Sequence, residues 1–137
     1  MNDKFFLDTN VCIYAFDTDS RKKEKALNLI ISNKATISTQ VVMETSNVAL
    51  KKLKLKYEEL QLSIDYITTF CSLHIIELST IKLAFQINRQ YHYSLYDALI
   101  IASAFESNCS ILYSEDMQHG HCIDKRLNIV NPFMTVS

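Results

Sequence analysis

The scarcity of glycine and proline is the feature that most limits how this chain can fold. The 137 residues contain one glycine, Gly120, and one proline, Pro132. Sandwiches and barrels need many tight turns, and glycine and proline supply much of the turn chemistry. The composition therefore favours a helix-rich α or α/β architecture. It also excludes a glycine-rich phosphate-binding loop, because such a loop needs several glycines close together.

Length and composition predict one globular domain over residues 1–137. A chain of this size buries about two thirds of its unfolded surface, and 48% hydrophobic with 21% charged residues is typical of a folded protein. The net charge of −1 lacks the basic excess of many nucleic-acid-binding domains, although charge can be segregated on a surface. No apolar run is long enough to span a membrane. Four cysteines without Cys-x-x-Cys spacing, and no signal peptide, predict reduced thiols and a cytoplasmic location.

Short apolar runs alternate with amphipathic segments along the chain. Strands are predicted at residues 5–7, 35–38, 73–78, 110–113 and 128–130, and helices at residues 11–16, 21–32, 40–53, 58–70, 79–91 and 95–107. Asp19 or Ser20 is expected to cap the helix that starts at residue 21. The helix over 95–107 is apolar nearly all round and is expected to lie buried against the sheet. The strand–helix–strand order predicts a parallel sheet.

Two acidic residues stand where predicted strands end. Asp8 directly follows the first strand, and Asp116 follows the fourth. In parallel α/β sheets, ligands bind beyond the carboxyl ends of the strands, so both side chains are candidates for a functional site. A structural role is the alternative for each: Asp8 as the cap of the next helix, and Asp116 as an ordinary loop acid.

Two more acidic residues are predicted on helices. Glu44 shares a helix face with Val41 and Val48, and a carboxylate within such a stripe is costly unless it is paired or bound to a metal. A helix rotated to bring Glu44 to the edge of the stripe would avoid that cost. Asp97 follows Ser94 by three residues, which matches a capping box. It also opens the most apolar helix, which would bring it near the end of the sheet.

These four carboxylates are predicted to meet on one side of the sheet. Clustered carboxylates raise the pKa of one another unless they share a cation. Oxygen ligands select hard cations such as Mg²⁺ or Mn²⁺ over zinc, and such ions activate water for attack on a phosphodiester. The nearby His119, His121 and Cys122 fit no standard zinc spacing.

Four segments, in order, resemble the motifs of the PIN-domain nucleases. They are residues 7–11, 37–44, 93–100 and 113–116, which read LDTNV, ISTQVVME, YSLYDALI and YSED. The similarity covers the whole chain and is most specific to the short stand-alone toxins of bacterial toxin–antitoxin pairs, the VapC-like type. It implies a three-layer α/β/α sandwich with a central, mainly parallel, five-stranded sheet.

The resemblance also implies an activity, that of a divalent-metal-dependent endoribonuclease. By this similarity Mg²⁺ or Mn²⁺ and the attacking water would be held by four catalytic carboxylates, Asp8, Glu44, Asp97 and Asp116. Hydrogen bonds from Thr9, Asn10 and Ser114 would support them. Many relatives carry an acid or Asn where this chain has His119, so the number of metal ions, one or two, stays open. The resemblance further implies a homodimer and a neutralising antitoxin protein.

Surface features bear on RNA and on the antitoxin. Arg21, Lys22, Lys51 and Lys52 are candidate phosphate contacts, although basic helix faces are more often simply solvated. An apolar groove between the helices at 40–53 and 58–70 would suit an amphipathic antitoxin helix. Alternatively, the apolar stripes of the two helices pack on each other.

Three other functions remain open on the sequence. The chain could be a PIN-domain nuclease or RNA-processing protein outside a toxin–antitoxin system, or a non-catalytic PIN-like binding protein. A binding protein is expected to have lost one of the four acids, and none is missing. A magnesium-dependent phosphatase with an aspartyl nucleophile is disfavoured, because it wants a second acid two residues after Asp8, where Asn10 stands.

Overall fold

The computed structural model describes residues 3–18 and 20–134 of the protein. Its elements, in chain order, are β1 (Phe5–Leu7), α1 (Thr9–Ile13), the 3₁₀ turn η1 (Tyr14–Phe16), α2 (Ser20–Ile30), β2 (Ala35–Ser38), α3 (Thr39–Lys51), α4 (Tyr57–Phe70), β3 (Ser72–His74), α5 (Leu78–Tyr91), α6 (Leu95–Glu106), β4 (Ile111–Tyr113), β5 (Cys122–Ile123) and β6 (Leu127–Val130). The predicted cap at Asp19 or Ser20 is not tested, because Asp19 and the side chain of Ser20 lie outside the described part of the chain.

All strands form one sheet in the order β3-β2-β1-β4-β6-β5. The pairs from β3 to β6 are parallel, as predicted, and β5 runs antiparallel to β6. The sheet therefore has six strands rather than the predicted five. The additional strand, β5, has two residues and pairs with β6 across a tight turn at Asp124 and Lys125, which both have positive φ. Two residues are too few to produce a recognisable alternation of apolar and polar side chains.

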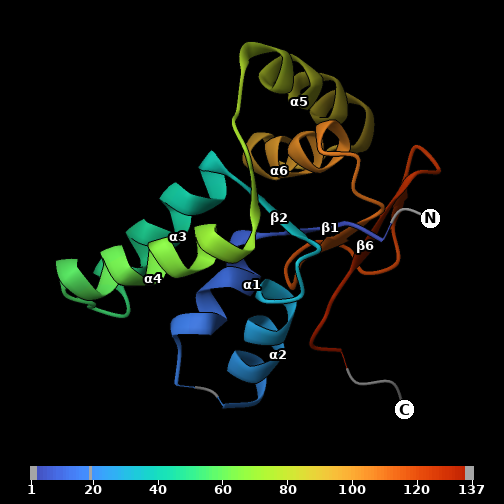
Figure 1. Ribbon diagram of the computed structural model, residues 1–137. Helices are drawn as coiled ribbons and strands as arrows, with labels where there is room; N and C mark the ends of the chain where they lie inside the picture. Colours follow the sequence, from blue (N-terminus) through green and yellow to red (C-terminus); the bar gives the residue numbers. More distant parts are fainter. Residues whose placement is uncertain (1–2, 19, 135–137) are drawn as a thin grey trace.

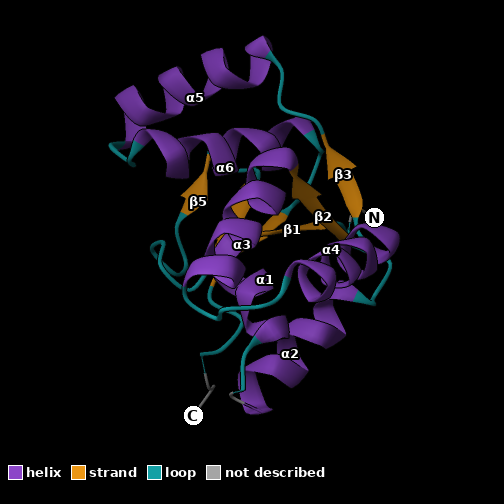
Figure 2. Ribbon diagram, turned by 90° about the vertical axis from the view of Figure 1, so that its left-hand side faces the viewer, coloured by secondary structure: helices purple, strands orange, loops and turns teal. Residues whose placement is uncertain are grey.

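Helices cover both faces of the sheet, so the architecture is the predicted three-layer α/β/α sandwich. Helices α1 to α4 lie on one side, and α5 and α6 lie on the other (Figures 1 and 2). The prediction that α6 is buried is confirmed, since Ala98, Ile100 and Ile101 are at most 1% exposed. The α6 helix packs between the sheet and α5, which explains why it is apolar nearly all round.

Strand β3 is shorter than the predicted strand at 73–78. It lies at the edge of the sheet and pairs only with β2, in a register that ends with Ser38 opposite His74. Because α3 begins at the next residue, Thr39, the sheet offers no further backbone partner beyond that pair. The chain instead turns away, the Ile76 N–H donates to Thr39 Oγ1, and α5 starts at Leu78.

The apolar faces of α3 and α4 pack on each other over the sheet. Val41 and Thr45 of α3 lie with Ile64 and Ile67 of α4 around one small interior gap beside Ile37. Of the two alternatives for these stripes, the structure therefore favours mutual packing over an open groove. All four cysteines are free thiols. Within the described residues, no helix combines the length and the apolar character needed to cross a membrane.

Candidate active site

The four predicted carboxylates line a single cleft at the carboxyl ends of β1 and β4. Asp8, Glu44, Asp97 and Asp116 border a space of ≈ 370 Å³. The remaining lining residues are Thr9, Asn10, Ile13, Asn47 and Val48. The two strand ends and the two helices thus bring together residues that are up to 108 positions apart in the sequence.

Asp8 occupies the centre of a hydrogen-bonded group and is only 6% exposed. It is the N-cap of α1, where its Oδ1 accepts the Thr9 backbone N–H at 2.7 Å. Its Oδ2 accepts a hydrogen bond from Ser114 Oγ at 2.8 Å and a longer one from Asn10 Nδ2 at 3.2 Å. Asp8 therefore caps α1, as the structural alternative predicts, and the same residue also lines the cleft.

Glu44 is held in the cleft by side chains from two helices. Thr9 Oγ1 donates to Glu44 Oε1 at 2.7 Å, which links the first turn of α1 to α3. Gln40 Nε2 lies 3.5 Å from Glu44 Oε2 and also donates to the Tyr96 carbonyl at 3.2 Å, which ties α3 to the start of α6. Glu44 is half-buried, next to the buried Val41 and Thr45 of the same helix. It thus lies where the apolar stripe of α3 opens into the cleft.

Asp97 and Asp116 complete the carboxylate lining from the other side. Ser94 caps α6 by accepting the Asp97 backbone N–H at 3.1 Å, which is one of the two hydrogen bonds of the predicted capping box, while Asp97 borders the cleft. Asp116 is exposed, and its Oδ2 accepts a hydrogen bond from Asn10 Nδ2 at 3.2 Å. The Asn10 amide therefore lies between the carboxylates of Asp8 and Asp116.

Burial and mutual repulsion make two of these acids harder to ionise. Burial raises the pKa of Asp8 to about 6, against the opposing effect of hydrogen bonds from Ser114 and Thr9. Burial also raises the pKa of Asp97, and the neighbouring charges of Asp116 and Glu44 add to the effect. No lysine or arginine is among the residues that line the cleft, and none of the four acids has an ion-pair partner in the described part of the chain. The cleft therefore concentrates negative charge without a cation to offset it.

The donor chemistry of the cleft fits a hard divalent cation. Its lining offers carboxylate, amide and hydroxyl oxygens and contains neither imidazole nor thiol, a set that suits Mg²⁺ or Mn²⁺ better than zinc. Over residues 3–18 and 20–134, no three carboxylate, imidazole or thiol groups already stand close enough to form a complete metal-binding set. The cleft is thus a candidate metal centre by its chemistry and charge.

The histidines after Asp116 are engaged in other contacts. His119 Nδ1 accepts a hydrogen bond from the Asn131 backbone N–H at 3.0 Å. His121 Nδ1 lies 2.5 Å from the Tyr93 hydroxyl and its ring stacks on that of Tyr93. Neither histidine is among the residues that line the cleft.

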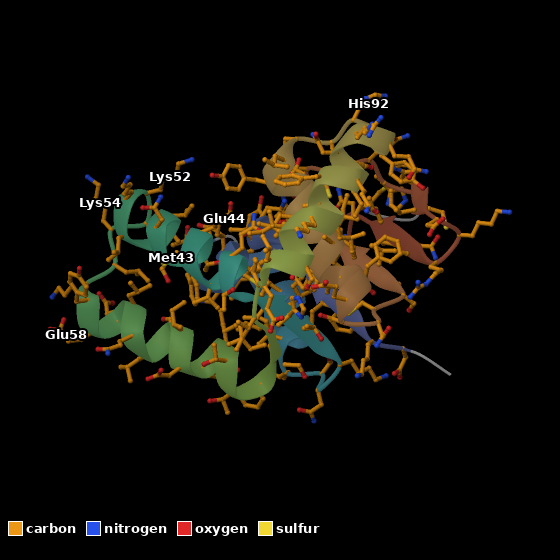
Figure 3. All side chains as sticks on the ribbon, turned by 90° about the horizontal axis from the view of Figure 1, so that it is seen from above. Met43, Glu44, Lys52, Lys54, Glu58 and His92 are labelled. Carbon is orange, nitrogen blue, oxygen red and sulfur yellow. The ribbon has the colours of Figure 1, made fainter. Side chains whose placement is uncertain are left out.

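The predicted phosphate contacts lie outside the cleft lining. Lys22 forms an ion pair with Glu115 at 2.6 Å, and Arg21 lies on the exposed surface of α2. Lys51 and Lys52 are exposed at the end of α3, about two helical turns beyond Glu44. Figure 3 shows Lys52 extending outward at that end of the helix, away from Glu44. Their role in RNA binding stays a prediction.

Sequence reasoning missed several residues of the cleft. Asn47 follows Glu44 by three residues, so helical spacing could have identified it, and Val48 was placed on the face of Glu44 without being identified as a lining residue. Ile13 and the bridging Gln40 carried no comparable signal. The ion pair between Lys22 and Glu115 joins residues 93 positions apart and was also missed.

The protein has a mainly parallel sheet that is covered by helices on both faces. A cleft lined by carboxylates lies at the carboxyl ends of its strands. The family model described as PIN domain matches residues 5–121. The chain therefore belongs to the PIN-domain family. No curated protein sequence matches it significantly.

Solved structures with the same fold come from several bacteria. A toxin–antitoxin complex from Klebsiella pneumoniae includes a chain with 18% identity and a TM-score of 0.73, covering 96% of this chain and 100% of that one. DNA-bound VapBC from Salmonella typhimurium matches at 20% identity and a TM-score of 0.67, covering 93% and 96%. VapC20 of Mycobacterium tuberculosis, a toxin that cleaves the sarcin–ricin loop, matches at 16% identity and a TM-score of 0.67, covering 82% and 90%. At these identities the likeness shows a shared fold.

Proposed function

We propose that this protein is a divalent-metal-dependent endoribonuclease that hydrolyses RNA phosphodiester bonds. The observation that carries the proposal is the single cleft lined by Asp8, Glu44, Asp97 and Asp116, with no lysine or arginine in its lining. Such a concentration of charge is unfavourable by itself and becomes favourable once a cation binds. Membership of the PIN-domain family supports the same function.

The roles of the individual side chains follow from their contacts. When bound, Mg²⁺ or Mn²⁺ would activate water and offset the charge of the scissile phosphate. The four carboxylates would hold the ion, and Thr9 would keep Glu44 turned toward the cleft through its 2.7 Å hydrogen bond. Ser114 and Asn10 would orient Asp8 by donating to its Oδ2. With a pKa of about 6, Asp8 is mostly ionised at neutral pH, as a metal ligand must be.

The α3 helix offers a path for the RNA backbone. Glu44, Asn47 and Lys51 are spaced three and four residues apart, so they share one face of the helix. Glu44 and Asn47 line the cleft, and Lys51 extends the same face toward Lys52. An RNA strand bound at the metal centre would contact Lys51 and Lys52 where it leaves the cleft. On α2 the corresponding candidate is Arg21, and Lys22 is the ion-pair partner of Glu115.

We further propose that the protein acts as the toxin of a toxin–antitoxin pair and is neutralised by a cognate antitoxin. The fold is shared with a chain of the Klebsiella pneumoniae toxin–antitoxin complex and with VapBC from Salmonella typhimurium. The similarity of all four motifs to those of VapC-like toxins supports this assignment. A homodimer and a cytoplasmic location belong to the same proposal.

The test is RNA cleavage by purified, partner-free protein with total cellular RNA in Mn²⁺, Mg²⁺ or EDTA. We expect cleavage in the presence of either ion, none in EDTA, and none from Asp8→Asn, which removes a ligand charge at nearly constant volume. Asp65→Asn, a matched change at an exposed acid on α4, should cleave at the parent rate. Cleavage by Asp8→Asn at that rate would refute the site, and a folded parent inactive with both ions would favour a binding role.

A further inference from the structure

Glu115 lies between Ser114, which donates to Asp8, and Asp116, which lines the cleft, yet its own side chain has other partners. Its Oε1 accepts a hydrogen bond from the Tyr14 hydroxyl at 2.7 Å. Its Oε2 pairs with Lys22 Nζ at 2.6 Å. The loop after β4 is thus attached to η1 and α2, which are both distant from it in the sequence.

The Lys22 ammonium makes several contacts in addition to its ion pair with Glu115. Besides the carboxylate, it donates to the Tyr14 hydroxyl at 3.1 Å and lies 4.7 Å from the centre of the Tyr14 ring. The ring of Phe133 is 5.4 Å away and packs edge-on against Tyr14. The Lys22 side chain is 34% exposed, and Lys23 and Lys25 are exposed. Two of the three N–H groups of the Lys22 ammonium therefore donate to Tyr14 and Glu115.

The backbone of Glu115 reaches the cleft through Asn10. The Glu115 N–H donates to Asn10 Oδ1 at 3.0 Å. This contact fixes the orientation of the Asn10 amide, because the Nδ2 group must then face Asp8 and Asp116, each 3.2 Å away. The reversed amide would place its oxygen against two carboxylates and its NH₂ group against the Glu115 N–H. The position of Glu115 therefore decides which atoms of Asn10 face the acids.

We propose that Glu115 is a positioning residue for the cleft, and that Lys22 and Tyr14 act through it. By anchoring the loop after β4, the Lys22–Glu115–Tyr14 group holds Asp116 and the Asn10 amide where they can serve a bound cation. Lys22 is thereby assigned to loop anchoring rather than to phosphate contact. The expected effect of this anchoring on RNA cleavage rests on the proposed function. Its expected effects on the orientation of Asn10 and on the affinity for a cation do not require RNA cleavage.

The test compares Lys22→Met and Glu115→Gln with a matched control. Lys34→Met breaks the ion pair between Lys34 and Asp3, which lies at the opposite end of the parallel strands. Two measurements do not require activity: the Asn10 side-chain amide resonances of metal-free protein, and the affinity for Mn²⁺. We expect both variants to shift the Asn10 resonances and to weaken Mn²⁺ binding about tenfold, as fits the loss of charged hydrogen bonds. Lys34→Met should change neither.

Kinetics separate anchoring from phosphate contact. With an active parent, anchoring predicts that Lys22→Met lowers kcat and leaves the KM for RNA unchanged. The charge-swapped pair, Lys22→Glu with Glu115→Lys, should recover part of the Mn²⁺ affinity. Unchanged Asn10 resonances and Mn²⁺ affinity, with a raised KM and a weaker salt dependence of RNA binding, would overturn the proposal in favour of phosphate contact.

Two outcomes remain interpretable if the first experiments fail. Should the parent cleave no RNA, the proposed function would fail, but the Asn10 and Mn²⁺ measurements would still decide on the anchoring role. Should Lys22→Met not fold, Tyr14→Phe removes one hydrogen bond to Glu115 and keeps the ring. It should produce a smaller shift of the Asn10 resonances in the same direction, and no shift would contradict the proposal.

Discussion

The Asp8 carboxylate is subject to two opposing effects, hydrogen bonds that favour its charged form and burial that disfavours it. It caps α1 through one oxygen and receives Ser114 and Asn10 at the other, while burial disfavours its charge. A helix cap alone would not need a carboxylate, since Asn or Ser can accept the same backbone N–H. The retained charge, at a cost in stability, is what a metal site requires. The sequence could place Asp8 at the end of a strand, and the family resemblance implied supporting hydrogen bonds from Ser114 and Asn10, but it did not say which carboxylate each would contact.

The cost of that charge should appear as a pH-dependent stability of the metal-free protein. The pKa of Asp8 is about 6 in the fold, above its ordinary value near 4. Between about pH 4 and 6 the folded state holds a proton that the unfolded chain has released, so stability falls as pH rises through this window. The loss is on the order of 3 kcal/mol.

Urea unfolding of the parent and of Asp8→Asn, in EDTA at pH 5 and at pH 7.5, measures this effect. We expect the variant to gain stability relative to the parent as pH rises, because Asn cannot ionise. The comparison cancels the other titrating groups that both proteins share. A stability difference that is the same at both pH values would contradict the assigned pKa shift.

At the scale of the element, α6 both packs in the core and carries a residue of the cleft. Its apolar residues pack between the sheet and α5, and its first turn delivers Asp97 to the cleft. Both properties were predicted from the sequence, because an apolar helix and its cap are local signals. Strand β5 was not predicted, and β3 was predicted too long, since the limits of both strands depend on neighbouring strands rather than on their own residues.

The cap of α6 can be tested by Ser94→Ala. This change removes the acceptor of the Asp97 backbone N–H and should lower the free energy of unfolding by about 1 kcal/mol. Ser94→Thr keeps a hydroxyl in the same place and should retain most of the stability. Chemical denaturation of both variants measures the difference. Equal losses from Ala and Thr would show that the hydrogen bond at this cap does not stabilise the helix.

At the scale of the whole molecule, the cleft exists only because the fold is complete. Four acids from two strand ends and two helices meet there, and the parallel topology predicted from the sequence explains why. The links between them could not be predicted, because Thr9 with Glu44 and Lys22 with Glu115 are pairings of distant side chains without a periodic signal. The fold was therefore more predictable than the contacts that orient its site.

Calorimetric titration of metal-free protein with Mn²⁺ tests the central claim most directly, because it requires neither an RNA target nor a partner. We expect saturable binding by the parent, loss of binding in Asp8→Asn, and weaker binding when Glu44, Asp97 or Asp116 is changed to its amide. Asp65→Asn, at an exposed acid on α4, should bind like the parent. Equal Mn²⁺ affinity for the parent and for Asp8→Asn would contradict the account of a carboxylate metal centre in this cleft.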